Sequence, residues 1–305
     1  MSSKAPLDLA PLAIRLAALW VLAGALFKLI AGTPADLPPV LHELPIGVDL
    51  FFKLAIGIEL VLVCMALLRP KLAWLPLVGL FLVFDAILAM SLGEESCGCF
   101  GASIPIPPAT MMGIDTLLLL AIIFSRPWNS EAKGIGPAPL LPVLGLVLLI
   151  FPYFYVGDNT INPKEDGSGP ELDGKRYVIL DVESWKDQMI YETEFAALFP
   201  AEIETLPTDG LFVFWRWDCD HCAKHFIDLV NTDDRSQPFV FVRLKKDTDN
   251  DENKAVSAMP TGGHVTHLEL PAGPQYVIET PAEFVLEGGT VVRAEEGVGK
   301  DEHEE

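Results

Sequence analysis

The sequence predicts an α-helical membrane bundle followed by an α/β domain, and hydropathy and charge are the observations that predict it. Half of the 305 residues are hydrophobic, and the mean hydropathy of +0.36 is higher than a chain that is soluble throughout usually has. Residues 1–156 contain 8 Lys and Arg against 10 Asp and Glu, whereas residues 157–305 contain 13 against 32. The first part is therefore expected to lie in lipid and the second part in water.

The acidity of the second part excludes two classes of interaction. Nucleic acid is excluded as a partner, because contacts with phosphates need a basic face. Electrostatic attachment to an anionic membrane surface is excluded as well, because it needs clustered Lys and Arg. Membrane lipid is therefore expected as a partner of the apolar helices alone.

Five apolar segments are long enough, or nearly so, to cross a hydrocarbon core, which is about 30 Å thick and takes about 20 helical residues. Gly and Pro mark the stretches between them, as they do in loops. The first segment contains Arg15 and Lys28 and is longer than the apolar region of a signal peptide, which favours a span over a cleaved leader. The predicted spans are residues 9–31, 48–68, 72–92, 110–124 and 140–156.

Basic residues in the short loops predict the orientation. The loops after the second and fourth spans each contain two basic residues, whereas loops 32–47 and 93–109 contain no Lys or Arg. Because basic loops stay in the cytoplasm, these two loops are expected outside. The fifth span then leads outward, so everything after Gly157 is expected on the extracytoplasmic side of a bacterial inner membrane.

Several ionisable side chains fall inside the predicted spans, where a charge is costly and usually faces the interior of the bundle. Lys28 and Lys53 lie near the outer ends and are expected to extend to the lipid headgroups. Glu59 and Asp85 lie deeper. Two interpretations of them are open: a paired or hydrogen-bonded contact between helices, and a polar pocket for a headgroup or a path for protons.

Four of the five cysteines form two close pairs, which indicates thiol chemistry. Cys97 and Cys99 flank Gly98 in loop 93–109, on the side where disulfides persist. Gly98 gives the backbone the freedom that so small a ring needs, and a strained disulfide of this kind is readily reduced. A pair of free thiols and half of a Cu(I) site are the alternatives. The fifth cysteine, Cys64, is interpreted as a small buried hydrophobic residue.

Cys219 and Cys222 form a Cys-X-X-Cys motif between an apolar run at 211–215, typical of a buried strand, and a helix predicted over 223–230. Cys219 is thus expected near a helix N-terminus, where the dipole and free N–H groups stabilise a thiolate. His221, inside the motif, adds to this stabilisation when it is protonated. The alternative is a metal site completed by the histidines His225, His264 and His267.

The second part resembles the thioredoxin family in this motif and in the segment Glu-Thr-Pro-Ala-Glu-Phe-Val-Leu at 279–286, which precedes a Glu-Gly-Gly turn and a further strand. The segment is similar to the Thr–cis-Pro loop and β-hairpin of that family. The resemblance implies that Thr280 and Pro281 pack against the active-site disulfide and dock the extended backbone of a substrate. The sequence departs from the family at Asp218 and Asp220, whose carboxylates oppose the stabilisation of the thiolate.

A second set of residues lies in the first part of the chain: Ile14-Arg15-Leu16, Gly24 and Lys28 in the first span, Glu59 in the second, and Cys97-Gly98-Cys99-Phe100-Gly101 before the fourth. In these residues the first part resembles the MauE/DoxX family of small four-helix membrane proteins. The Cys-Gly-Cys motif is similar to that of the MauE branch, which is associated with methylamine utilisation. In that pathway a membrane protein and a separate thioredoxin-like protein are connected with disulfide formation in a periplasmic dehydrogenase subunit, and the resemblance implies that this chain fuses both modules.

These features predict the order of parts along the chain. A MauE/DoxX-like four-helix membrane domain is expected over residues 1–128, followed by a fifth span over 129–157. A Gly-, Pro- and acid-rich linker is expected over 158–174, a thioredoxin-like extracytoplasmic domain over 175–295, and an acidic tail over 296–305.

The expected function is that of a membrane-bound thiol–disulfide oxidoreductase that supports disulfide formation in exported proteins. Electrons would pass from extracytoplasmic protein thiols to Cys219 and Cys222, then to Cys97 and Cys99, and, by analogy with other four-helix disulfide-generating proteins, to a quinone. Cys219 is expected to be the attacking thiolate and Cys222 the resolving thiol. Two alternatives are open: a membrane-anchored copper or zinc chaperone with Cys and His ligands, and a chaperone that holds clients without redox turnover.

Overall fold

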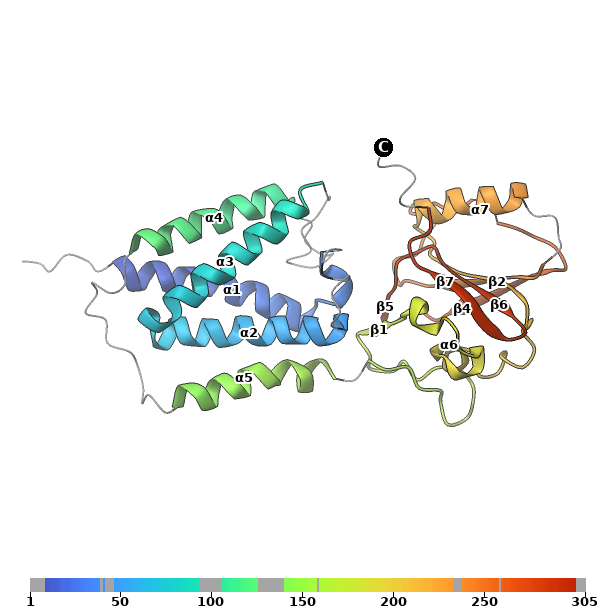
Figure 1. Cartoon of the computed structure of the whole chain (residues 1–305), viewed down its shortest axis with the longest axis horizontal. Coiled ribbons are helices and arrows are strands. Elements are labelled where there is room, and N and C mark those ends of the chain that lie inside the picture. The colour runs from blue at the N-terminus through green and yellow to red at the C-terminus, as the bar shows by residue number, and fades with distance from the viewer. Residues whose placement is uncertain are drawn as a thin grey trace, which may run out of the picture. The chain divides into compact units, whose positions relative to one another are not determined.

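The computed structural model of the chain describes residues 9–38, 41, 47–93, 106–125, 140–157, 159–232, 237–257 and 259–299. The chain folds into two compact units, Met1–Gly157 and Asp158–Glu305 (Figure 1). Among the described residues, the first unit is built of helices and the second contains both helices and strands.

The first unit contains five α-helices among its described residues, and four of them are long and apolar enough to cross a membrane. This confirms the predicted helical membrane part. Pro70 and Pro108 begin two of the helices, because the fixed φ and missing N–H of proline suit the first helical position. The helices are α1 (Leu9–Ile30), α2 (Val48–Leu68), α3 (Pro70–Met90), α4 (Pro108–Ser125) and the shorter α5 (Leu140–Val156).

A buried core of small and aliphatic side chains joins α1, α2, α3 and α4. Ala17, Ala18, Ala66 and Ala73 are fully buried, and their small size lets the helices approach closely, as in other membrane bundles. Large apolar side chains are exposed on all five helices. A helix that is apolar on its outer face as well as its inner face suits a surrounding of hydrocarbon.

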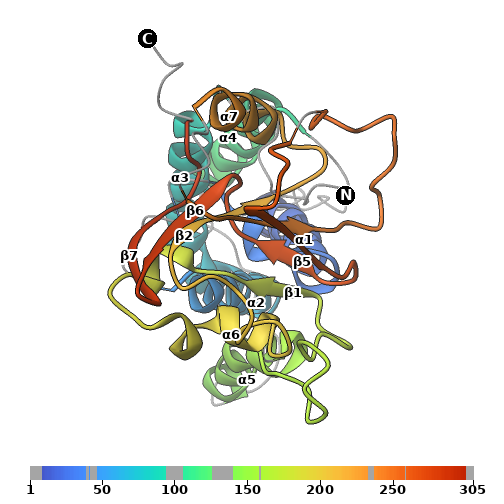
Figure 2. The ribbon, with the colours of Figure 1, turned by 90° about the vertical axis from the view of Figure 1, so that its right-hand side faces the viewer.

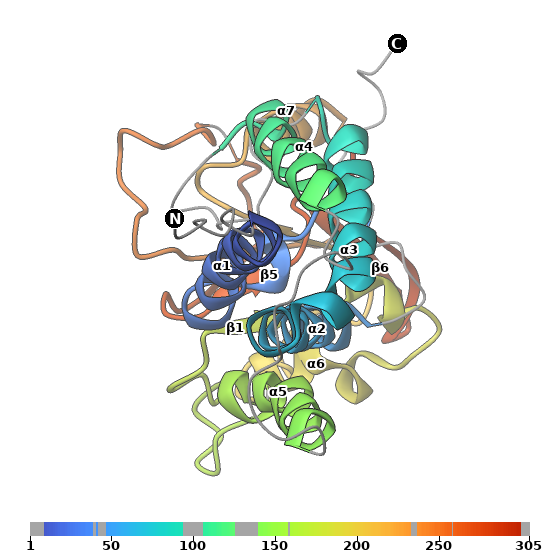
Figure 3. The same ribbon diagram turned by 90° about the vertical axis from the view of Figure 1, so that its left-hand side faces the viewer.

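Helix α5 packs beside α2, as Figures 1 and 3 show. Gly57 of α2 permits this packing, because a Cβ there would lie 2.6 Å from the carbonyl O of Leu149. Beyond the end of α5, the Nζ of Lys53 donates to the carbonyl O of Gly157 (2.9 Å) and pairs with Asp49 (2.7 Å). Lys53, expected to extend to the headgroups, therefore connects α2 to the end of α5 instead.

The second unit is built on a mixed five-stranded sheet with the strand order β4-β3-β2-β6-β7. Strands β2, β3 and β4 are parallel, β6 is antiparallel to β2, and β7 is antiparallel to β6. Strands β1 and β5 form a separate parallel pair. The elements are β1 (Tyr177–Ile179), the 3-10 helix η4 (Val182–Trp185), α6 (Glu194–Leu198), β2 (Gly210–Trp215), α7 (Asp220–Thr232), β3 (Phe239–Leu244), β4 (Val265–Leu270), β5 (Gln275–Val277), β6 (Ala282–Glu287) and β7 (Thr290–Glu295).

Helix α7 covers one face of this sheet and α6 the other, as Figure 2 shows. All six residues of β2 are buried, which is typical of a central strand. Alternate side chains point to opposite faces. Phe212 and Phe214 contact Phe195 of α6, with ring centroids 5.6 and 6.1 Å apart, and Trp215 contacts Phe226 of α7 at 5.6 Å. The strand that precedes the two cysteines is thus fixed from both sides.

The expected linker, residues 158–174, contributes to the core of the second unit. Ile161 and Leu172 are buried there, and between them the chain turns back, with the N–H of Lys164 donating to the carbonyl O of Gly169 (2.8 Å). Burial removes both apolar side chains from water, which favours this packed form over an extended one. Two isolated apolar residues in a polar stretch give no periodic signal in the sequence.

Gly210, at the start of β2, is expected to tolerate no side chain. Its φ is +141°, and a Cβ would lie 2.4 Å from the carbonyl O of Pro238. Gly273 has a nearly equal φ of +143° but open space around the Cβ position, so it is a matched control. We predict that Gly210→Ala lowers the free energy of unfolding of the second unit by about 2 kcal/mol more than Gly273→Ala does.

Hydrogen exchange of the full-length protein over a urea series measures this difference. Peptides from β2 and β3 report the opening of the sheet in each variant. Equal opening free energies in the two variants would contradict the close approach of the Pro238 carbonyl to Gly210.

Candidate functional site

Cys219 and Cys222 lie between the end of β2 and the first turn of α7, as the sequence predicts. Strand β2 ends at Trp215 and α7 begins at Asp220. The two cysteines form a disulfide with a Cα–Cα distance of 5.2 Å. Cys222 is fully buried, whereas Cys219 is partly exposed, and the N–H of Cys222 points at the Sγ of Cys219 (3.0 Å). A thiolate from solvent therefore reaches Cys219 more readily than Cys222.

The loop that contains Thr280 and Pro281 lies against Cys219, although 61 residues separate Thr280 from Cys219. The Thr280–Pro281 peptide bond is cis, and Pro281 is buried. The Oγ1 and carbonyl O of Thr280 lie 3.5 and 3.6 Å from the Sγ of Cys219. The structure thus brings together the disulfide and the loop that the resemblance places beside it.

The buried carboxylate of Glu283 contacts α7, the helix whose first turn contains Cys222, and the sequence did not predict this contact. His225, one turn after Cys222, pairs with Glu283 of β6, and Glu283 also contacts Arg293 of β7 (3.2 Å). The Glu283 side chain is only 5 % exposed, so the two partners compensate for the removal of its carboxyl group from water. The contact follows from the pairing of β6 with β2, and residue spacing gives no sign of it.

The histidines considered as metal ligands contact aromatic or acidic side chains in this structure. The ring of His264 packs against Phe239, and the ring of His267 stacks on Phe241. His221 is exposed in the first turn of α7. Within the described part of the chain, no group of three or more His, Cys, Asp and Glu side chains could hold a metal ion.

The charge of Asp218, next to Cys219, is offset by a lysine. The Nζ of Lys246 lies 2.7 Å from the Oδ2 of Asp218, and the two side chains are 40 % and 31 % exposed. The neighbouring ring of Trp217 is covered by the guanidinium of Arg243, 4.1 Å from the ring centroid. The expected opposition of Asp218 to a thiolate at Cys219 is therefore weaker than the sequence alone suggests.

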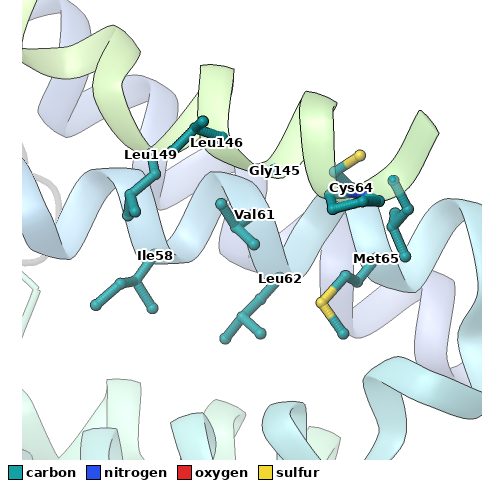
Figure 4. A pocket seen from close by; sticks show the side chains of 10 residues that line it. Ile58, Val61, Leu62, Cys64, Met65, Gly145, Leu146 and Leu149 are labelled. Carbon is teal, nitrogen blue, oxygen red and sulfur yellow. The ribbon is translucent and has the colours of Figure 1, made fainter. Parts of the chain in front are cut away.

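The cysteines of the first unit lie in two different regions. Cys97 and Cys99 lie outside the described residues. Cys64 is free and lines a groove between α2 and α5, shown in Figure 4. Apolar side chains such as Met65 and Leu146 line the same groove, which suits a hydrocarbon chain.

Four ionisable side chains within the predicted spans, Lys28, Glu59, Asp85 and Asp115, contact partners on other helices. Lys28 of α1 pairs with Glu59 of α2, a contact between helices that the position of Lys28 near the end of its span does not predict. These contacts favour the first interpretation of Glu59 and Asp85, which is contact between helices. Two of the hydrogen bonds between helices have a carboxylate acceptor: Trp20 Nε1 to Asp115 Oδ1 (2.9 Å) and Thr116 Oγ1 to Asp85 Oδ2 (3.2 Å).

In comparisons with family models, with curated proteins and with solved structures, no match to this chain was found. The structure shows a helical unit with four helices that are long and apolar enough to cross a membrane. In the same chain it shows an α/β unit with a disulfide at the N-terminus of a helix.

Replacing Lys246 with methionine is expected to lower the reactivity of Cys219 in the reduced protein. The substitution leaves the charge of Asp218 without this partner, and that charge then opposes thiolate formation. Because the pair is partly exposed, we expect the rate of alkylation by iodoacetamide at neutral pH to fall by about twofold. Lys245→Met is the control, since Lys245 pairs with Glu269. An unchanged rate in Lys246→Met would rule out this electrostatic coupling.

Proposed function

We propose that this chain is a membrane-bound thiol–disulfide oxidoreductase whose reactive centre is the Cys219–Cys222 disulfide. The observation that carries the proposal is the unequal exposure of the two sulfurs, together with the contact of Thr280 with the accessible one. Such an arrangement suits an exchange reaction in which an incoming thiolate attacks one particular sulfur.

The order of elements supports a thioredoxin-like identity for the second unit. Strand β2 leads into the disulfide and α7, β3 follows, and a cis-proline precedes the hairpin formed by β6 and β7. This is the order that the resemblance to the thioredoxin family implies. In that family the cis-proline loop docks the extended backbone of a substrate, and we assign the same task to Thr280 and Pro281.

In the proposed reaction, a thiolate of an exported protein attacks the Sγ of Cys219. The bond to Cys222 breaks, Cys222 leaves as a thiolate, and a mixed disulfide joins Cys219 to the client. A second client thiolate then attacks the client sulfur of that bond and releases Cys219 as a thiolate, which the N–H of Cys222 at 3.0 Å stabilises. The client is oxidised by two electrons and gains a disulfide, while the Cys219 and Cys222 pair is left reduced.

The reduced pair is proposed to be reoxidised by Cys97 and Cys99 of the helical unit through the same exchange. The two electrons then pass, with two protons, to a quinone as the proposed acceptor. The four membrane-length helices and the resemblance of the first part to the MauE/DoxX family support this assignment. The proposed setting is a bacterial inner membrane, with the second unit on the extracytoplasmic side, and methylamine utilisation is the process that the MauE resemblance suggests.

Cys222→Ala is expected to accumulate mixed disulfides with exported proteins, and Cys219→Ala is not. In this variant the Cys219 thiolate attacks a disulfide of an exported protein, one client sulfur leaves as a thiolate, and a mixed disulfide forms that no internal thiol at position 222 can release. Without Cys219 the accessible sulfur is lost. Acid quenching and alkylation of cells, followed by non-reducing electrophoresis, detect the adducts. The double variant serves as the blank. Equal trapping by both single variants would reject Cys219 as the attacked sulfur.

Replacing both Cys97 and Cys99 with serine is expected to leave Cys219 and Cys222 reduced in cells. The second unit should still fold, because a two-residue-spaced pair has little loop entropy to remove. Mass-shift labelling of free thiols reads the redox state, and Cys64→Ser is the matched control that removes a cysteine but no pair. If the double variant is as oxidised as the parent, the relay is wrong and the first unit is better explained as an anchor.

A further inference from the structure

Residues 296–298, expected to belong to an acidic tail, follow β7 and contact the cis-proline loop, residues 279–281. We name residues 296–298 the C-terminal strap. Its backbone donates two hydrogen bonds to the loop: Gly297 N to Glu279 O (3.4 Å) and Val298 N to Pro281 O (3.0 Å). Because the same loop contacts Cys219 through Thr280, the strap supports one wall of the disulfide site.

The carboxylate of Glu296 adds two side-chain hydrogen bonds to the backbone contacts of the strap. Its Oε2 accepts a hydrogen bond from the N–H of Glu279 (3.1 Å), and its Oε1 accepts one from the N–H of Val182 in η4 (3.0 Å). One side chain thus satisfies two backbone N–H groups that belong to separate segments. A buried N–H without an acceptor is unfavourable, so these contacts hold the loop and η4 together.

Charged groups from two other segments, the start of η4 and the turn after β2, act on the carboxylate of Glu296. Asp181 and Glu183, at and beside the start of η4, repel its carboxylate, and Arg216, between β2 and α7, attracts it. Burial raises the pKa of Glu296 to about 7, helped by the two acidic neighbours and opposed by the two N–H donors. The carboxylate therefore gains and loses its proton around neutral pH.

We propose that Glu296 is a positioning residue that holds the cis-proline loop against Cys219 and makes exchange at the disulfide depend on pH. The inference rests on the proposed thiol–disulfide function. Loosening the loop returns Glu296 to water, where the carboxylate is favoured, so a pKa raised by burial means that the held loop favours the protonated carboxyl. The loop is therefore held more tightly when Glu296 is protonated. When Glu296 ionises, the loop loosens and Cys219 is more accessible to small thiols.

The first experiment measures the loop and not the reaction. Hydrogen exchange of the full-length oxidised protein follows the amides of residues 279–284 between about pH 6 and about pH 8, corrected for intrinsic exchange, a range that brackets the titration of Glu296. In the parent, protection should fall with rising pH by about fivefold, which corresponds to one net hydrogen bond. In Glu296→Gln, which is neutral throughout, protection should stay constant.

Glu295→Gln is the matched control, because it removes the adjacent, exposed carboxylate and should leave the parent profile unchanged. The same pH dependence in Glu296→Gln as in the parent overturns the inference. The pH profile of the parent is itself a test that needs no substitution, and a flat profile there also overturns it.

The second experiment measures the reaction. The rate of disulfide reduction by dithiothreitol is followed over the same pH range and divided by the thiolate fraction of the reagent. The parent rate should rise by about threefold as Glu296 ionises, in proportion to the weaker hold on the loop, whereas Glu296→Gln should keep the slow rate. A Glu296→Gln profile that follows the parent contradicts the positioning role, even if the variant unfolds at a lower temperature.

The two proposals fail in distinguishable ways. If Cys222→Ala traps no client, the oxidoreductase function fails, while hydrogen exchange still reports whether Glu296 holds the loop. If clients are trapped and the loop is equally protected with and without the Glu296 carboxylate, the function stands and the positioning role of Glu296 is rejected.

Discussion

The antiparallel register of β2 and β6 determines where the disulfide site forms. Phe214, near the end of β2, pairs with Ala282, the first residue of β6. The turn that follows β2 and the loop that precedes β6 therefore meet at one edge of the sheet, and they contain Cys219 and the cis-proline. Burial fixes this register, because a shift of one residue would turn Phe212 and Phe214 toward the opposite face.

The helical unit meets a different constraint, which is the cost of charge in hydrocarbon. Lys28 and Glu59 neutralise one another between α1 and α2, while Asp115 and Asp85 accept hydrogen bonds from neighbouring helices. A lone charge at the centre of a span would cost about 3 kcal/mol or more, so such contacts also select which helices lie together. The first unit thus keeps polar contacts inside and apolar side chains outside, whereas the second surrounds an aromatic core with acidic residues.

The elements with a strong local signal could be predicted from the sequence. The membrane helices follow from hydropathy, and β2 from an uninterrupted apolar, aromatic run. The helix after the Cys-X-X-Cys motif was expected from residue 223, and it begins at Asp220, so that Cys222 lies in its first turn. The contact of Thr280 with Cys219 was expected only from the resemblance to the thioredoxin family, because neither residue alone indicates it.

Contacts between distant segments had no such signal. Strand β4 mixes polar and apolar residues, with only Leu270 fully buried, so no period marks it as a strand. Glu296 is one of many acidic residues near the C-terminus, and only the joint approach of β7, η4 and the cis-proline loop partly buries it. The pairing of His225 with Glu283 depends in the same way on a sheet that must form first.

The hydrogen bond from Lys53 to Gly157 has a mechanical consequence. It ties the last residue of the helical unit to α2, which in turn packs on α1 and α3. The chain therefore leaves the helices from a point that is held by two of them. A force on the second unit would load α2 and α5 together, and the tether would resist extraction better than a single helix in lipid.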